Sequence, residues 1–201
     1  MDMLKTTDHL IHEIGFGSLY MSPCINMFEE NEHFKLLKSE YDKMLDRLDI
    51  CLEQKNYKEL SAIKNLFKVL KRVHRGRVRN RFCGAAKNMI AIDKNGCIYP
   101  CQRFVSNKNY IIGSVKKGID IDKYNNLMGN EMGLSSREGC NKCWAASLCG
   151  GGCPNENLVA NGIPNKPIEQ YCEIIKYFIE NIILRYLKLN KEEKEVIFQD
   201  L

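Results

Sequence analysis

Apolar residues near the start of the chain recur at helical spacing in two stretches. They run over residues 37–48 and 60–74, and each predicts a helix with one apolar face. Ahead of them, residues 6–8 (Thr-Thr-Asp) offer N-caps for a short helix that ends at Gly15. The alternating stretch FGSLYMSPCI then predicts a strand closed by Pro23. The order helix, strand, helix, helix is that of an α/β layer, but one strand cannot form a sheet by itself.

The second half of the chain predicts short strands, loops and one long helix. The segments MIAID and CIYPC indicate a hairpin with Gly96 in the turn, and residues 111–115 predict a further strand. A long helix with a broad apolar face begins around Pro167. Asn190 with Glu193 forms a capping pattern for a last short helix.

Cysteine usage divides the chain near residue 82. Of the ten cysteines, only Cys24 and Cys51 precede this point, and we interpret these two as packing residues. We therefore expect an α+β protein with a mostly helical domain over residues 1–82 and a small cysteine-rich domain over residues 83–201. The apolar fraction of 44% and the charged fraction of 27% are those of a globular chain, so both domains should be packed.

The chain has no apolar run long enough for a membrane span and no signal-peptide pattern at its start. We therefore expect a cytoplasmic protein without a membrane partner, and in that reducing compartment thiols serve metal binding more often than disulfides. Six basic side chains lie in KRVHRGRVRNR, residues 71–81. No aromatic residues for base stacking lie among them, so a nucleic-acid partner is not expected. A solvated face, contact with an acidic peptide and charge compensation for an anionic cluster stay open.

Candidate metal ligands are most concentrated in CNKCWAASLCGGGCP, residues 140–154, where four cysteines are separated by two, five and three residues. Thiolates bind zinc, cuprous copper and iron-sulfur clusters, and the spacing does not name the metal. Structural zinc sites usually consist of two short hooks far apart in the chain. The three glycines at 150–152 permit positive φ and close approach to a bulky inorganic core, which favours a cluster larger than one ion. Trp144 is interpreted as a shield for such a cluster, as a core aromatic residue, or as both.

Eight cysteines after residue 82 would fill two four-cysteine sites. Cys97 is the least suitable of them, because an extended strand places it roughly 13 Å from Cys101 at about 3.3 Å per residue. Seven firm ligands leave one centre with an open or non-cysteine position, and none of the four histidines lies among them. The eight are Cys83, Cys97, Cys101, Cys140, Cys143, Cys149, Cys153 and Cys172.

This arrangement resembles the seven-cysteine pattern of the SPASM domain over about residues 83–189. The segments CGAAKNMIAIDKNGCIYPCQRF, IIGSV and CNKCWAASLCGGGCP are similar to those of peptide-maturing members such as thioether-forming maturases. In that family the domain follows a radical S-adenosylmethionine barrel and holds two auxiliary 4Fe-4S clusters. The resemblance assigns Cys83, Cys101 and Cys153 to the first cluster, with Cys97 as a candidate fourth ligand. It assigns Cys140, Cys143, Cys149 and Cys172 to the second.

The resemblance also implies that residues 1–82 are the last strand and helices of a partial α/β barrel. The family's catalytic motif Cys-x3-Cys-x2-Cys is absent from the whole sequence: Cys149 and Cys153 have its first spacing, but position 156 is Glu. We therefore expect the C-terminal portion of a peptide-modifying enzyme, unable by itself to cleave S-adenosylmethionine. S-adenosylmethionine and a third cluster would bind only if the missing catalytic half of the enzyme were supplied.

By resemblance, the clusters accept an electron from a peptide radical or bind the peptide at an open iron. The expected partners are a peptide substrate or leader peptide and a separate radical S-adenosylmethionine barrel half. Two alternatives stay open. One is a docking module for a peptide or partner whose clusters have no redox role, and the other is a structural zinc-binding module.

Overall fold

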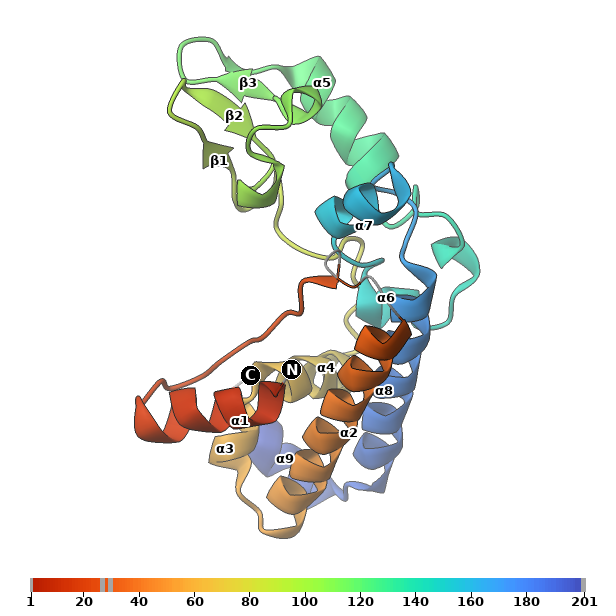
Figure 1. Ribbon diagram of the computed structural model, residues 1–201. Coiled ribbons are helices and arrows are strands. Elements are labelled where there is room, and N and C mark those ends of the chain that lie inside the picture. Colours follow the sequence, from red (N-terminus) through yellow and green to blue (C-terminus); the bar gives the residue numbers. More distant parts are fainter. Residues whose placement is uncertain (1, 26–27, 29–30, 200–201) are drawn as a thin grey trace. The chain divides into compact units, whose positions relative to one another are not determined.

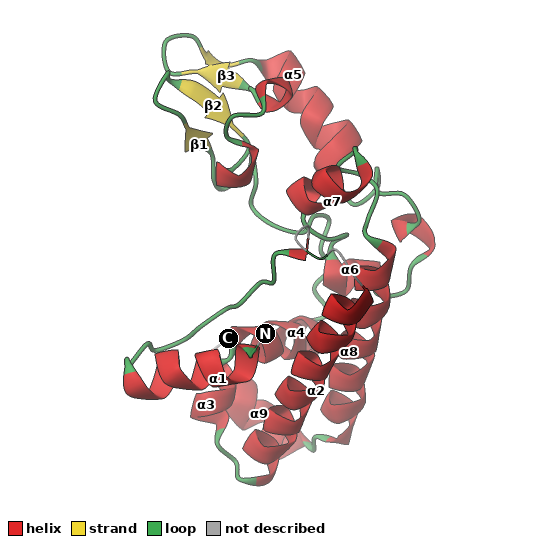
Figure 2. Ribbon diagram, viewed as in Figure 1, coloured by secondary structure: helices red, strands yellow, loops and turns green. Residues whose placement is uncertain are grey.

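A computed structural model describes residues 2–25, 28 and 31–199 of the chain. The chain forms two compact units, which we call the helical unit (Met1–Val78 with Glu169–Leu201) and the cysteine unit (Arg79–Ile168). The protein belongs to the α+β class, as the sequence predicts: it is mostly helical and has one small antiparallel sheet (Figures 1 and 2). The last helices join the N-terminal ones, whereas the sequence placed them with the cysteines in residues 83–201.

The helical unit is built around the packing of α8 against α2 and α4. Leucines of α2 and α4 are fully buried in its core together with Ile182 of α8, because the apolar stripe of each helix must be covered by another. None of the described helices is long and apolar enough to cross a membrane. The elements of this unit are α1 (Met3–Asp8), the π-helical turn η1 (His9–Glu13), α2 (Asn31–Glu53), α3 (Tyr57–Ala62), α4 (Lys64–Arg75), α8 (Glu169–Lys188) and α9 (Lys191–Phe198).

Two expectations for the N-terminal segment are wrong. The first helix begins at Met3 and not after residues 6–8, because the Asp2 side chain accepts a hydrogen bond from the backbone N–H of Lys5 at 3.3 Å. The strand expected up to Pro23 does not form. In the part of the chain that the structure describes, residues 16–25 have a single β-bridge, which joins Leu19 to Ile63.

The helix expected over residues 60–74 is interrupted at Ile63, whose backbone leaves the helical region (φ −83°, ψ 85°). Leu19 explains the interruption. Its N–H donates to the carbonyl of Ala62 at 2.9 Å, and its carbonyl accepts from the N–H of Lys64 at 2.8 Å. The alternating N-terminal segment therefore pairs with a break between two helices instead of joining a sheet.

The two helices predicted near the C-terminus are confirmed. Helix α9 begins at Lys191 with a complete capping box, in which Asn190 and Glu193 bond to each other's backbone N–H at 2.9 Å. In α8, Arg185 binds both carboxylate oxygens of Asp49 at 2.6 and 2.7 Å, which fixes α8 along α2.

The cysteine unit contains the sheet, with strands in the order β1 (Ala91–Ile92), β2 (Cys97–Tyr99), β3 (Gly113–Ser114) and β4 (Gly118–Ile119). All neighbours are antiparallel, and Ile92 pairs with Ile98 while Cys97 pairs with Ser114. The predicted hairpin is confirmed: Gly96 occupies its turn with φ +79°, a conformation that favours glycine. The strand expected at 111–115 is present but shorter.

Short helices and turns make up the rest of the cysteine unit. Its apolar core gathers Tyr99, Phe104, Ile112 and Met132 beside the sheet. The helical elements are η3 (Gln102–Phe104), η4 (Lys108–Tyr110), α5 (Ile121–Leu127), η5 (Met128–Met132), η6 (Cys140–Lys142), α6 (Ala146–Cys149) and α7 (Pro154–Asn161). The cysteines lie mostly at the ends of these elements.

Candidate metal centre

The glycine loop after α6 has the conformation that the sequence predicts. Gly150, Gly151 and Gly152 all have positive φ, at +82°, +85° and +76°. A Cβ on Gly150 would lie 2.7 Å from the carbonyl oxygen of Arg81, and one on Gly151 would lie 3.1 Å from Cγ of Arg137. The glycines therefore permit close approach to two other segments of the protein.

Arg79 fastens the segment before Cys83 to the same loop. Its backbone N–H donates to the carbonyl of Ser147 at 2.8 Å, and its Nη1 donates to the carbonyl of Cys149 at 3.0 Å. These contacts hold the chain entering Cys83 against α6 and the glycine loop. Cysteines from distant parts of the sequence are brought together in this way.

The first group of thiols consists of Cys83, Cys101 and Cys153. Burial raises the pKa of the Cys101 thiol, and the nearby thiols of Cys83 and Cys153 raise it further. The backbone N–H groups of Arg103 and Phe104 point to the Cys101 sulfur and act in the opposite direction. Residues more than fifty positions apart therefore share one electrostatic environment, as their assignment to one centre requires.

Cys153 is surrounded by donors because it is the N-cap of α7. Burial raises the pKa of its thiol, while the nearby backbone N–H groups of Glu156 and Asn155 lower it. Nη1 of Arg103 lies 3.6 Å from the same sulfur and 2.5 Å from Oε1 of the buried Glu156. N–H groups directed at sulfur stabilise thiolate ligands and tune iron-sulfur potentials.

The second group consists of Cys140, Cys143 and Cys149, from η6, its C-cap and the last residue of α6. Burial raises the pKa of the Cys140 thiol, and the nearby thiols of Cys149 and Cys143 add to the effect. Arg137 opposes them through its positive charge. The short spacing in CNKC and the tight turns of η6 and α6 thus gather three thiols on one side of the glycine loop.

The spacing of the thiols can be compared with that of a zinc site. Zinc binds thiolates at about 2.3 Å, so tetrahedral partners lie about 3.8 Å apart. Within the described ranges, no three cysteines have Sγ atoms that all lie within 4.8 Å of one another. In each group, at least one pair of Sγ atoms therefore lies more than 4.8 Å apart.

Two arginines, Arg137 buried and Arg81 half-buried, lie beside these thiols and have incomplete hydrogen bonding. Arg137 is 2% exposed, and its Nε and Nη2 have no hydrogen-bond partner among the described residues. Arg81 has the same deficit at Nε and Nη1 and lines a small cavity with Cys83 and Pro154. Burying cationic groups without partners is costly. The cysteine unit therefore fits an anionic group, such as a thiolate-ligated iron-sulfur cluster, at this place.

Two further candidate ligands belong to other elements of the fold. Cys172 is half-buried in the first turn of α8, which belongs to the helical unit, so its assignment to the second cluster stays a prediction. Cys97 begins β2, and its N–H donates to Oδ1 of Asp93 at 2.9 Å. Its side chain packs against the apolar core of the cysteine unit, and its role as a ligand also stays a prediction.

Three other expectations can be checked directly. Trp144 is 54% exposed, so its interpretation as a core residue is wrong. Cys51 is 1% exposed and is confirmed as a packing residue, whereas Cys24 is exposed and is not one. The alternating arginines of the basic run 71–81 would share one face in an extended segment, but the run is not extended throughout, because α4 continues through Arg75 and ends at Gly76 with φ +59°.

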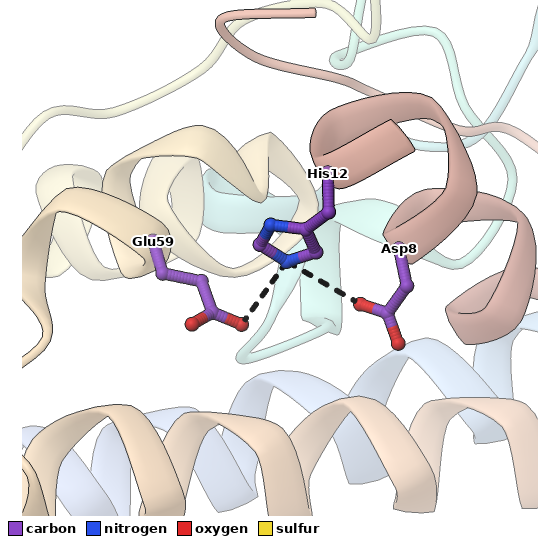
Figure 3. A group of neighbouring side chains, drawn as sticks. All are labelled: Asp8, His12 and Glu59. Atoms are coloured by element: carbon purple, nitrogen blue, oxygen red, sulfur yellow. Dashed lines mark ion pairs between the residues drawn. The ribbon is translucent and has the colours of Figure 1, made fainter. Parts of the chain in front are cut away.

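One polar cluster was not predicted from the sequence. In the helical unit, Nε2 of His12 lies 4.0 Å from Oδ1 of Asp8 and 3.9 Å from Oε1 of Glu59 (Figure 3). Arg47 donates to both carboxylates, at 2.9 Å to Asp8 and 2.6 Å to Glu59. Because the one guanidinium of Arg47 binds both carboxylates, the cluster is an ion-pair network that joins α1, α2 and α3.

Comparison with known protein families finds no family that matches the chain, and no curated protein matches it. The fold and the site therefore define only a class. The protein is an α+β chain whose cysteine unit contains two groups of thiols near the buried Arg137.

Proposed function

We propose that the chain binds two auxiliary 4Fe-4S clusters as the C-terminal SPASM portion of a radical S-adenosylmethionine enzyme that modifies peptides. The main support for this proposal is the way in which the thiols are grouped. The Cys149 thiol raises the pKa of the Cys140 thiol, whereas the Cys153 thiol, only four positions later, raises the pKa of the Cys101 thiol. This crossed pattern agrees with the ligand assignment that the resemblance implies. Two-cluster ferredoxins have a comparable crossing, because the fourth cysteine of their ligand run binds the other cluster.

The residues around the thiols support a redox site. When bound, the clusters would supply an electron acceptor for a peptide radical, or an iron position at which a peptide binds. The backbone N–H groups at the starts of η3 and α7 stabilise the thiolates of Cys101 and Cys153. Burial of these sulfurs limits the access of water. With three thiols in the first group, one position there is left for another ligand.

The zinc alternative has less support, because the thiols in each group are not gathered at single-ion spacing. The docking alternative differs from the proposal only in what the clusters do. If reducing the clusters leaves the affinity for a candidate peptide unchanged and no electron passes to them, the module is a docking surface. A peptide-dependent change in the oxidation state of the clusters would support electron transfer.

The remaining parts of the proposal follow from the resemblance. Residues 1–82 would be the end of a partial barrel, whose catalytic half, carrying Cys-x3-Cys-x2-Cys, would be a partner of this chain together with a peptide substrate or leader peptide in the cytoplasm. These 201 residues lack that motif. The chain incubated with reductant and S-adenosylmethionine should therefore yield no 5′-deoxyadenosine, and formation of this product would contradict the proposal.

The crossed grouping gives the proposal its sharpest test. Cys149→Ala and Cys153→Ala should each remove about half of the iron, from different clusters, and the double variant should lose nearly all of it. Electron paramagnetic resonance of the two reduced single variants should show different remaining signals. Identical signals from both variants would mean that the two cysteines serve one centre, which contradicts the assignment.

A further inference from the structure

We infer that Arg137 is a buried counter-charge shared by the two cysteine groups, which favours the reduced state of the clusters. This inference rests on the proposed function, since it concerns the groups that the thiols would hold. It goes beyond ligand assignment, because it gives an electrostatic role to a residue outside the cysteine pattern.

The backbone fixes Arg137 at the entrance to the second group. Its N–H donates to the carbonyl of Leu134 at 3.1 Å, and its own carbonyl accepts from the N–H of Cys140 at 3.3 Å. Its side chain passes directly over the glycine loop, since a Cβ on Gly151 would lie 3.1 to 3.2 Å from Cγ, Cδ and Nε. The guanidinium is thus held between the turn at Cys140 and the loop that leads to Cys153.

The hydrogen bonding of Arg137 is incomplete for a structural arginine. Nη1 donates to the carbonyl of Pro164 at 2.8 Å, an acceptor that Asn157 shares at 3.1 Å. Nε and Nη2 have no hydrogen-bond partner in the described ranges, and no described carboxylate forms an ion pair with this residue. A guanidinium has five N–H donors, so most of its capacity is left for an anionic group.

The charges that act on Arg137 come from both groups of thiols. Burial lowers its pKa, and the thiols that oppose this effect are, in decreasing order, those of Cys140, Cys153, Cys83 and Cys149. Two of these belong to the first group and two to the second. Arg137 is therefore placed to interact with both centres at once.

The expected effect on redox chemistry follows from electrostatics. Reduction adds one negative charge to a cluster, and a buried positive charge nearby stabilises the product because the surroundings screen it weakly. Removing the charge at position 137 should therefore make both clusters harder to reduce. A structural role, in which the side chain only fills space and holds Pro164, would not depend on charge.

The test compares Arg137→Gln, which removes the charge, with Arg137→Lys, which keeps it, in the reconstituted full chain. Redox titration followed by electron paramagnetic resonance gives the midpoint potentials. Arg137→Gln should lower the equilibrium constant for one-electron reduction at least about tenfold, which is a fall of about 59 mV. Arg137→Lys should lower it less than about threefold. Arg77→Gln removes the same charge from an exposed position and should leave both potentials unchanged.

Each outcome decides the inference. Loss of a cluster in Arg137→Gln but not in Arg137→Lys, with unchanged circular dichroism, would also support it, because charge is then needed to retain the cluster. Unchanged potentials, or equal effects of both variants on potential or retention, would overturn it while the proposed function stands. A wild-type chain without acid-labile sulfide would overturn both.

Discussion

At Cys153, burial raises the pKa of the thiol and nearby donors lower it, and this balance determines the protonation state of the sulfur before a metal binds. Burial raises the pKa of this thiol, so the metal-free chain keeps it protonated near neutral pH. Its N–H donors and Arg103 then stabilise the thiolate once a metal displaces the proton. A thiol with this environment is inert until metal binds, which suits a ligand better than a nucleophile.

Cys97 provides a test of the ligand set. It begins a strand and packs against the core of the cysteine unit. We predict that Cys97→Ala retains more than about nine-tenths of the iron of the wild-type chain, because its sulfur serves neither cluster. Iron analysis after anaerobic reconstitution measures this. A fall to about half would show that Cys97 is the fourth ligand of the first cluster.

Cys51 predicts a pH dependence of stability in the helical unit. Burial, aided by the charge of Glu59, raises the pKa of this thiol from 9.0 to about 11. Between these values the unfolded chain loses the proton while the folded chain keeps it, so stability falls as the pH rises above 9. The loss from this group should reach about 1 kcal/mol by pH 10.

Denaturant unfolding at pH 7 to 10 tests this in the metal-free chain. Cys51→Ala should be less stable at pH 7 because the substitution leaves a cavity. Its free energy of unfolding should, however, fall by about 1 kcal/mol less than that of the wild-type chain as the pH rises to 10. Cys24→Ala, which removes an exposed thiol, should lose as much stability between pH 7 and 10 as the wild-type chain. An alkaline loss as steep in Cys51→Ala as in the wild-type chain would show that Cys51 is not its source.

At the scale of elements, periodicity and capping predicted the long helices well. Helices α2, α8 and α9 follow from apolar stripes and from the capping box at Asn190, which are local signals. The break at Ile63 was not predictable, because it depends on backbone pairing with Leu19, over forty residues away. Helices of one or two turns, such as α6, contain too few residues to show a period.

The glycine loop yields a prediction with an internal control. Gly150 and Gly162 have similar φ angles, +82° and +78°, but only Gly150 lies against another segment, at the carbonyl of Arg81. Gly162→Ala should cost about 1 kcal/mol for its left-handed backbone. Gly150→Ala should cost at least about 2 kcal/mol more, because the added methyl overlaps with backbone.

Denaturant unfolding of the metal-free chain compares the two glycine variants. Gly150→Ala should also lower the iron content after reconstitution, since the contact with Arg81 brings Cys83 to the loop. Equal destabilisation by the two substitutions would mean that the close approach at Gly150 contributes nothing.

At the scale of the whole molecule, the metal chemistry of the cysteines stays a prediction, and the sequence did not predict the burial of the charged residues near them. The cysteine spacing and its resemblance to a known pattern indicated which thiols gather. The burial of Arg137 and Glu156 was not predicted, because tertiary contacts decide whether a charged residue is buried. Weak signals were present. Arg137 precedes Cys140 by three positions, and Arg81 ends a basic run for which charge compensation was one open interpretation.

Cys172 tests whether the helical unit contributes to metal binding. The resemblance assigns it to the second cluster, while the structure places it in α8 of the helical unit. We predict that Cys172→Ala lowers the iron content by about half, as Cys149→Ala does, because each removes a ligand of the same cluster. Cys24→Ala, the matched thiol loss in the same unit, should have no effect. Full iron retention in Cys172→Ala would restrict both centres to the cysteine unit.

The central claim is that two inorganic clusters, and not single ions, occupy the thiol groups. Analysis of iron, zinc and acid-labile sulfide in the anaerobically reconstituted chain tests it most directly. The account predicts about eight iron and about eight sulfide per chain. Two zinc ions without sulfide under the same conditions would contradict it.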